Sequence, residues 1–128
     1  MNKNPTILLV EDESPAVFAI EKYLTDAGFS VLTAFSAQEG LKTAMEQHPK
    51  VIVLDVVMPT ESGLDILPEL RADSWGQNAK VIVFSNLSDD EHKALANKYN
   101  VDGYLVKTDT SLKDLESTVR QLLPKNER

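Results

Sequence analysis

Short apolar runs recur along the chain, and a polar residue ends each of them. Four runs rich in aliphatic residues occupy positions 7–10, 51–54, 81–84 and 104–106. Runs of this length and composition are typical of strands buried on both faces of a parallel sheet. A further strand is predicted at residues 29–33, where Phe29, Val31 and Thr33 alternate with Ser30 and Leu32.

Segments with helical spacing of apolar residues separate these strands. The predicted helices span about residues 14–27, 36–48, 64–70, 88–99 and 111–123. Strand and helix therefore alternate about five times. This alternation predicts an α/β fold, a doubly wound five-stranded parallel sheet with helices on both faces and right-handed crossovers.

Local signals refine the helix ends. Ser14 is predicted to cap the first helix, with proline in its first turn. Capping boxes are predicted to begin at Ser36 and Ser88. Pro68 should kink the third helix or delay its regular part. Since Ser88 would cap the fourth helix, Ser85 is left with no structural role.

Two further packing expectations concern the second half of the chain. The spacing of the fourth helix predicts that Leu95 and Tyr99 face inward. Val106, which ends an apolar run, is predicted to be buried.

Length, charge and composition narrow the possible functions. The chain has 128 residues, which fits one domain over residues 1–128 with a core at about 4–123. Its net charge of -7 disfavours direct binding to nucleic acid or anionic lipid. The absence of cysteine excludes disulfides and thiolate chemistry. No apolar stretch approaches the ~20 residues of a membrane span, so a cytoplasmic protein without membrane association is expected.

The residues that follow the strands are chemically distinctive. They are Glu11, Asp12, Asp55, Ser85 and Lys107. Because parallel strands present their carboxyl ends at one edge of a sheet, these side chains should gather in one crevice. Clustered carboxylates should raise at least one pKa unless a cation enters. Each acid taken alone could merely cap a helix, and a lone lysine could be a surface charge; the combination favours a divalent cation and a phosphoryl group.

Five stretches in this order and spacing carry a family resemblance. They are residues 8–13, 53–59, 63–65, 81–86 and 103–107. The chain resembles the receiver domain of two-component response regulators over about residues 4–123. The resemblance implies a flavodoxin-like (βα)5 fold with strand order 2-1-3-4-5.

The resemblance also implies roles for the acidic residues. Asp55 matches the phosphoacceptor of the family. Glu11 and Asp12 match an acidic pair that holds Mg²⁺, Asp12 directly and Glu11 through water. The backbone carbonyl of Val57 would be a further ligand of this cation.

Three more roles follow from the same resemblance. Ser85 matches a hydroxyl that meets the phosphoryl group, and Lys107 matches a lysine that pairs with it. Tyr104 matches an aromatic residue whose rotamer changes with Ser85 when the domain switches. The surface that changes would be formed by the segments at 88–99, 104–106 and 111–123.

The implied function is that of a switched signalling domain and not of an enzyme. A sensor histidine kinase or a histidine phosphotransfer protein would supply the phosphoryl group, and a downstream protein partner or output domain would read the result. Self-catalysed phosphorylation and dephosphorylation would be weak.

Several residues depart from the family pattern. Thr108 follows the lysine, where the family usually has proline, so a trans peptide is expected there. Asn86 stands where a small residue is usual. Val57 and Leu87, two positions beyond the acceptor and the hydroxyl, are apolar and unable to orient an attacking water, which predicts slow loss of the phosphoryl group.

Three alternatives are weaker. A haloacid-dehalogenase-like phosphatase would need an acid two residues beyond its aspartate, where Val57 stands. In a flavodoxin-like FMN binder the first loop would cradle phosphate, but the acids at residues 11–13 would repel it. A degenerate receiver that is never phosphorylated would not be expected to keep the whole constellation.

Overall fold

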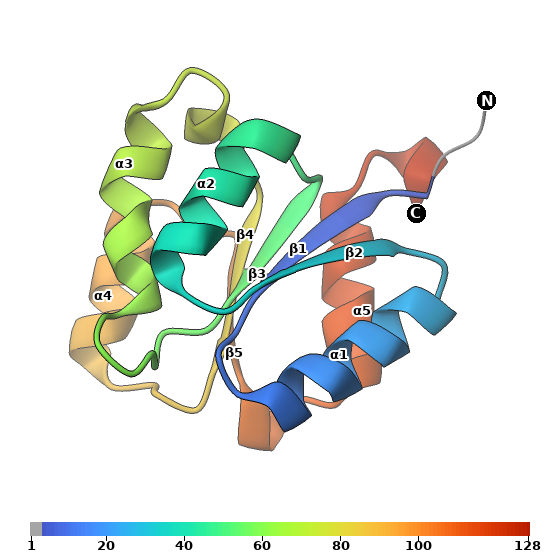
Figure 1. Cartoon of the computed structure of the whole chain (residues 1–128), viewed down its shortest axis with the longest axis horizontal. Coiled ribbons are helices and arrows are strands. Elements are labelled where there is room, and N and C mark those ends of the chain that lie inside the picture. Colours follow the sequence, from blue (N-terminus) through green and yellow to red (C-terminus); the bar gives the residue numbers. More distant parts are fainter. Residues whose placement is uncertain (1–3) are drawn as a thin grey trace.

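The sheet consists of five parallel strands. The computed structural model describes residues 4–128. The strands lie in the order β2-β1-β3-β4-β5 (Figure 1). Their bounds are Thr6–Val10 for β1, Ser30–Ala34 for β2, Val51–Leu54 for β3, Val81–Ser85 for β4 and Gly103–Val106 for β5. The predicted class, strand number and strand order are all confirmed.

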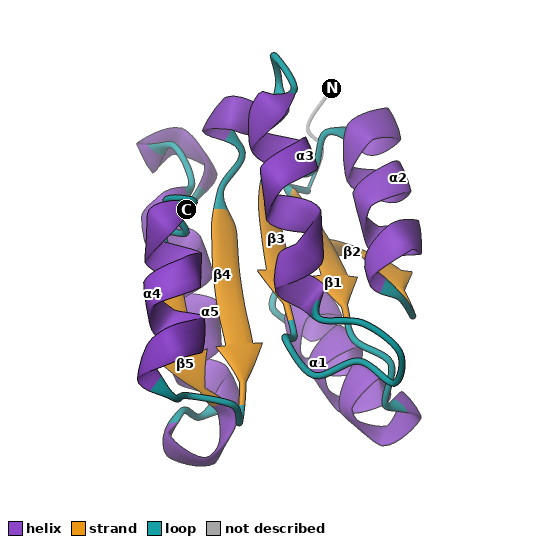
Figure 2. Cartoon of the chain, turned by 90° about the vertical axis from the view of Figure 1, so that its left-hand side faces the viewer, coloured by secondary structure: helices purple, strands orange, loops and turns teal. Residues whose placement is uncertain are grey.

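Helices cover both faces of this sheet. Figures 1 and 2 show α1 and α5 on one face and α2, α3 and α4 on the other. No helix within residues 4–128 is long and apolar enough to cross a bilayer. The helices span Ser14–Asp26 (α1), Ala37–Gln47 (α2), Leu67–Ala72 (α3), Asp90–Lys98 (α4) and Leu112–Leu122 (α5).

Two apolar clusters, one on each face, hold the layers together. In β1, Leu8 and Val10 pack with α2 and α3, while Ile7 and Leu9 pack with α1 and α5. Adjacent residues of a strand point to opposite faces, so a strand covered on both sides must be apolar throughout. This is why the central strands appear in the sequence as unbroken apolar runs.

The structure corrects two predicted helix caps. Ser14 is the first residue of α1. Glu13 occupies the N-cap position of this helix and makes no side-chain capping bond. The cap of α4 is Asp89, whose carboxylate accepts the backbone N–H of His92, and not Ser88. A carboxylate at this end also interacts favourably with the helix dipole, which explains why the cap lies one residue later. By contrast, the Ser36 side chain caps α2 as predicted, but Glu39 accepts the N–H of Phe35 and not that of Ser36, so the predicted capping box is only half formed.

Three packing details also differ from or refine the expectation. Leu95 is exposed, and Ala96 takes the inward position of α4 with Tyr99 packed beside it. Val106 is only half-buried because β5 is an edge strand with a neighbour on one side alone. Pro68 lies in the first turn of α3, after a 3₁₀ turn over Gly63–Ile66, so the regular helix is delayed as predicted.

The second strand also begins one residue later than expected. β2 starts at Ser30 and ends at Ala34, whereas the alternation predicted residues 29–33. Phe29 precedes the strand and is buried among the residues of α1 and α5. Burial of its ring in the core, rather than pairing in the sheet, accounts for its apolar character.

Candidate functional site

The predicted acidic residues converge at the carboxyl edge of the sheet. Residues Val10 and Leu54 are register partners in β1 and β3, so Glu11 and Asp55 follow them side by side. The backbone N–H of Asp55 donates to the Val10 carbonyl at 3.0 Å and extends this pairing by one step. One carboxylate oxygen from each of Glu11, Asp12 and Asp55 lies within 4.8 Å of the others. Three acids could therefore share one cation.

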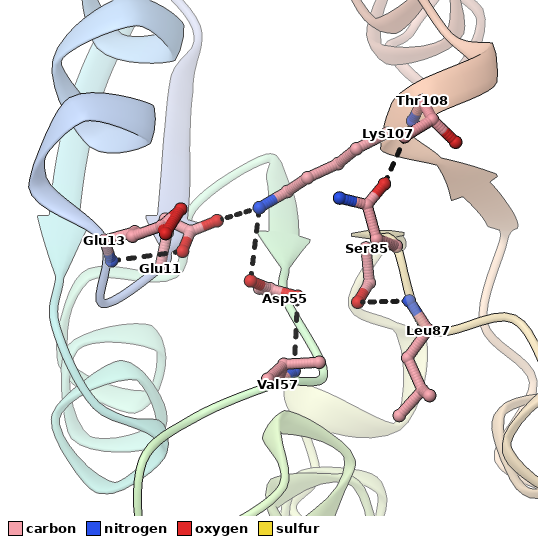
Figure 3. Close-up of polar contacts among 9 residues, drawn as sticks. Glu11, Glu13, Asp55, Val57, Ser85, Leu87, Lys107 and Thr108 are labelled. Atoms are coloured by element: carbon pink, nitrogen blue, oxygen red, sulfur yellow. Dashed lines mark hydrogen bonds and ion pairs between the residues drawn. The ribbon is translucent and has the colours of Figure 1, made fainter.

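Lys107 reaches this cluster from the other side of β4. Its Nζ donates to Glu11 Oε1 and, at 3.2 Å, to Asp55 Oδ2 (Figure 3). The side chains are 19% exposed for Lys107, 2% for Glu11 and 8% for Asp55, so both ion pairs are shielded from bulk water. The ammonium group thus offsets part of the negative charge that the three acids bring together.

Burial and these charges shift two pKa values. Burial, together with the negative charge of Asp55, raises the pKa of Glu11 above its usual value, although the hydrogen bond from Lys107 opposes the rise. Burial alone would lower the pKa of Lys107, but the hydrogen bond to Glu11 and the charges of Asp55 and Glu11 outweigh it and raise that pKa. The direction agrees with the expected rise of at least one carboxyl pKa, although burial contributes more to it than the neighbouring charge.

An open cavity of about 530 Å³ lies over these groups. Glu11, Asp12, Asp55 and Lys107 line it, together with residues of the loops after β3 and β4. The space is many times the ≈ 30 Å³ of a water molecule, so it accommodates a hydrated cation beside a phosphoryl group.

The loop after β3 is tightly folded around the acceptor. Val57 lines the cavity, its N–H donates to Asp55 Oδ1 at 3.2 Å, and its side chain is exposed. Gly63 returns to the strand end, where a Cβ would lie 1.8 Å from the Asp55 carbonyl oxygen. Only glycine can lie so close to another backbone. The sequence marked Gly63 as part of a motif but gave no reason for it.

Ser85 and Tyr104 are both bonded to Leu87. Ser85 is fully buried, and its Oγ accepts the Leu87 N–H at 3.3 Å (Figure 3). Tyr104 donates its hydroxyl to the Leu87 carbonyl. The prediction that Ser85 has no structural role is therefore wrong, because its hydroxyl orders the loop after β4. The cavity lining includes the next residue, Asn86, and not Ser85.

The loops after β4 and β5 are joined by one further hydrogen bond. The Thr108 N–H donates to Asn86 Oδ1 at 3.0 Å. Within residues 4–128 no peptide bond is cis, so the expected trans bond before Thr108 is confirmed.

Fold and site together define a class of protein. An acidic cluster and a lysine at the carboxyl edge of a 2-1-3-4-5 sheet are the features of a phosphoacceptor signalling domain. A sequence model of the response regulator receiver domain matches residues 7–120, and the chain belongs to this family.

Curated relatives support this assignment. The transcriptional regulatory protein PrrA of Mycobacterium tuberculosis is 34% identical over 120 residues, which cover 94% of this chain and 50% of that protein. AfsQ1 of Streptomyces coelicolor, also a transcriptional regulatory protein, is 32% identical over 97% of this chain and 53% of its own length. The chain thus spans about half the length of the curated relatives it matches.

Solved structures agree on the fold. The chemotaxis protein CheY4 of Vibrio cholerae superposes with a TM-score of 0.86 at 26% identity, covering 94% of this chain and all of that one. The response regulator TrrA of Thermotoga maritima, solved in complex with Mg²⁺-BeF, gives a TM-score of 0.82 at 28% identity, with 93% of this chain and 99% of TrrA covered. Receiver domains of this family bind Mg²⁺ at such acidic clusters and act with histidine kinases and output domains.

Proposed function

We propose that Asp55 accepts a phosphoryl group from a phosphohistidine of a sensor histidine kinase or a histidine phosphotransfer protein. The observation that carries the proposal is the position of the Asp55 carboxylate, which lies at an open cavity beside two acids and an ammonium group. In the transfer, an Asp55 carboxylate oxygen attacks phosphorus as the P–N bond breaks, and the departing imidazole nitrogen takes up a proton. Positioning and charge neutralisation supply most of the rate of such reactions.

We assign Mg²⁺ to the acidic cluster. Glu11, Asp12, Asp55 and the backbone carbonyl of Val57 would hold it, with water at the remaining positions. The donors fit this ion, because Mg²⁺ prefers a few carboxylate oxygens and keeps several waters. Three carboxylates against one ammonium also leave an excess of negative charge in a partly buried site. When bound, the cation would offset the charge of the phosphoryl oxygens.

Lys107 and Ser85 would contact the transferred group. The Lys107 Nζ is already 3.2 Å from an Asp55 oxygen, so it needs little movement to pair with a phosphoryl oxygen there. Ser85 is fully buried and does not line the cavity, so it must move before its hydroxyl can donate to the same group, and the Leu87 N–H that its oxygen accepts would move with it. Phosphorylation would therefore disturb the loop after β4.

Tyr104 would carry this change to the surface. The Leu87 carbonyl accepts the Tyr104 hydroxyl, while the Leu87 N–H is bonded to Ser85. A movement of Leu87 toward the site would break the tyrosine bond and allow a new rotamer. The face of α4, β5 and α5 would then change and recruit a downstream protein partner or an output domain.

The protein acts as a phosphoacceptor with only weak self-catalysis. Val57 and Leu87 offer no polar group to align an attacking water, so we propose a slow loss of the phosphoryl group. We further propose a cytoplasmic location, a single receiver domain over residues 1–128 with its core at about 4–123, and no direct binding of nucleic acid or membrane.

Mass spectrometry of the intact protein tests the main point. Incubation with acetyl phosphate and Mg²⁺ should add one phosphoryl group, and omission of Mg²⁺ or the change Asp55→Asn should abolish the gain. Asp26→Asn is the matched control, since Asp26 is an exposed residue of α1 that pairs with Lys22. A mass gain that persists in Asp55→Asn contradicts the assignment. Repeated turnover of a simple phosphate ester would instead favour a phosphatase.

A further inference from the structure

Two residues that depart from the family pattern contact each other. Asn86 follows the buried Ser85, and Thr108 follows Lys107, in loops that leave neighbouring strands. The Asn86 side chain accepts the Thr108 backbone N–H at 3.0 Å. Each departure taken alone has no obvious purpose, but together they form one hydrogen bond beside the candidate site.

The Thr108 N–H lies just beyond the hydrogen-bonded ladder of β4 and β5. At the start of β5 the Asp102 N–H donates to the Val81 carbonyl of β4 at 2.7 Å. In a parallel ladder every second N–H of a strand points to the same neighbour, so the N–H groups of residues 104 and 106 face β4, and Thr108 follows in a 3₁₀ turn over Lys107–Asp109. Proline at position 108 would have no N–H there, whereas threonine has one, and in this exposed turn it donates to the Asn86 side chain.

Beyond the last strand pair the Thr108 N–H donates to a side chain and not to the backbone of the loop after β4. The final register partners of β4 and β5 are Ser85 and Val106. The next carbonyl along the loop that could continue the ladder, that of Leu87, accepts the Tyr104 hydroxyl. The Asn86 amide oxygen takes its place, so a side chain extends the β4–β5 pairing by one step.

This hydrogen bond restrains the residue that carries the ammonium group. Lys107 lies between Val106, the end of β5, and Thr108, whose N–H is held by Asn86. The Lys107 side chain must span from there to Glu11 and Asp55. Fixing the peptide on its C-terminal side restricts the directions in which this side chain can leave the backbone.

We propose that Asn86 is a positioning residue: the clasp between Asn86 Oδ1 and the Thr108 N–H holds Lys107 over the acceptor. The proposal rests on the proposed function, since it concerns how Lys107 meets a phosphoryl group on Asp55. Asn86→Ala should therefore weaken binding of beryllofluoride, a mimic of that group, at saturating Mg²⁺. A neutral hydrogen bond is worth about 0.5–1.5 kcal/mol, so the expected loss is about twofold to twelvefold.

The Mg²⁺ affinity distinguishes a positioning role of Asn86 from a general loss of structure at the site. Lys107 pairs with Glu11 and Asp55, so it competes with a cation for their oxygens. A less restrained Lys107 should leave Mg²⁺ affinity, measured without beryllofluoride, unchanged or slightly stronger. A general weakening of the site would lower both affinities together. Asn78→Ala, which removes an exposed asparagine before β4, is the matched control and should change neither.

A double-mutant cycle tests the clasp itself. Thr108→Pro removes the N–H, so Asn86→Ala should change beryllofluoride affinity by less than about twofold in that background. Both affinities are followed by NMR titration of backbone amides. Equal effects of Asn86→Ala in the unaltered chain and in the Thr108→Pro background, or parallel loss of both affinities, would overturn the proposal.

Hydrogen exchange of the Thr108 amide tests the clasp without metal and without a proline variant. The Thr108 amide of the metal-free chain should exchange about twofold to twelvefold more slowly than the same amide in Asn86→Ala, in line with one lost hydrogen bond. Equal exchange rates would refute the clasp even if Asp55 is phosphorylated. If the unaltered chain takes neither a phosphoryl group nor beryllofluoride, the proposed function fails, which is a different outcome.

Discussion

Replacing Lys107 by methionine removes the positive charge from the acidic cluster and keeps most of the side-chain length. The Lys107 Nζ contacts Glu11 and Asp55, whose side chains are only 2% and 8% exposed. Without the ammonium group, two shielded carboxylates face each other and Asp12 with no counter-charge. We expect Lys107→Met to destabilise the metal-free protein.

The burial of these ion pairs sets the expected loss of stability. Removing one partner of a buried ion pair costs about 3–5 kcal/mol. The cavity admits water to this site, so we take the lower end of the range, about 3 kcal/mol. A urea m-value of about 2 kcal/mol/M converts this into a fall of about 1.5 M in the unfolding midpoint. Lys80→Met is the control, since its pair with Asp102 is 4.0 Å long and half-exposed, and it should cost less than about 1 kcal/mol.

The assay is urea unfolding followed by circular dichroism, in EDTA and in about 10 mM Mg²⁺. The variant should lose stability mainly in EDTA, because a cation can replace the missing ammonium and stabilises whichever form binds it. The loss should also shrink as the pH falls, since loss of the Lys107 hydrogen bond removes one contribution that lowers the Glu11 pKa. Equal losses in EDTA and Mg²⁺, or a gain of stability in EDTA, would refute the reasoning.

Three further predictions concern other parts of the site and fold. Gly63→Ala places a Cβ against the Asp55 carbonyl and should cost about 1–3 kcal/mol in urea unfolding, with weaker Mg²⁺ binding in titrations; unchanged binding would contradict the close approach. The pKa of Glu11 is raised in the folded state, so the contribution of Glu11 to stability is complete below the ordinary pKa of 4.5 and is lost as pH rises through the folded pKa. Glu11→Gln should therefore remove this part of the dependence of metal-free stability on pH. Arg71 donates to four backbone carbonyls in the loops that precede β4 and β5, so Arg71→Met should lower the free energy of unfolding by about 3 kcal/mol. Arg71→Lys should restore little of this stability, because an ammonium group cannot donate to four acceptors in that geometry. Full recovery of stability with lysine would argue against this role of the guanidinium group.

The fold could be predicted because its central strands are buried on both faces. Such strands have no polar side, so they appear as short apolar runs at residues 7–10, 51–54 and 81–84, and each run coincides closely with a strand. The convergence of Glu11, Asp12 and Asp55 follows from the same geometry, because parallel strands end at one edge. The strand order follows from the family resemblance, since periodicity alone does not fix it.

The details that escaped prediction depend on hydrogen bonds between alternative partners. Ser88 and Asp89 are both good capping residues, and the sequence does not say which of them the backbone will use. The structural role of Ser85 has no signal in the sequence, because its partner, the Leu87 N–H, lies in an irregular loop. The bond between Asn86 and Thr108 joins residues 22 positions apart and has no periodic signal, although both residues depart from the family pattern.

Lys107 pairs with two acids of the cluster, Glu11 and Asp55, and a change in one pair affects the other. It stabilises the metal-free site by pairing with Glu11 as well as Asp55. A cation on the same oxygens would compete with the Glu11 pair and leave Lys107 free to favour Asp55, where a phosphoryl group would sit. Linkage requires the reverse effect too, so an ammonium group drawn toward Asp55 would make the Glu11 oxygens more available to the cation. One lysine can therefore hold an acidic site together before metal arrives and still couple metal binding to phosphoryl transfer afterwards.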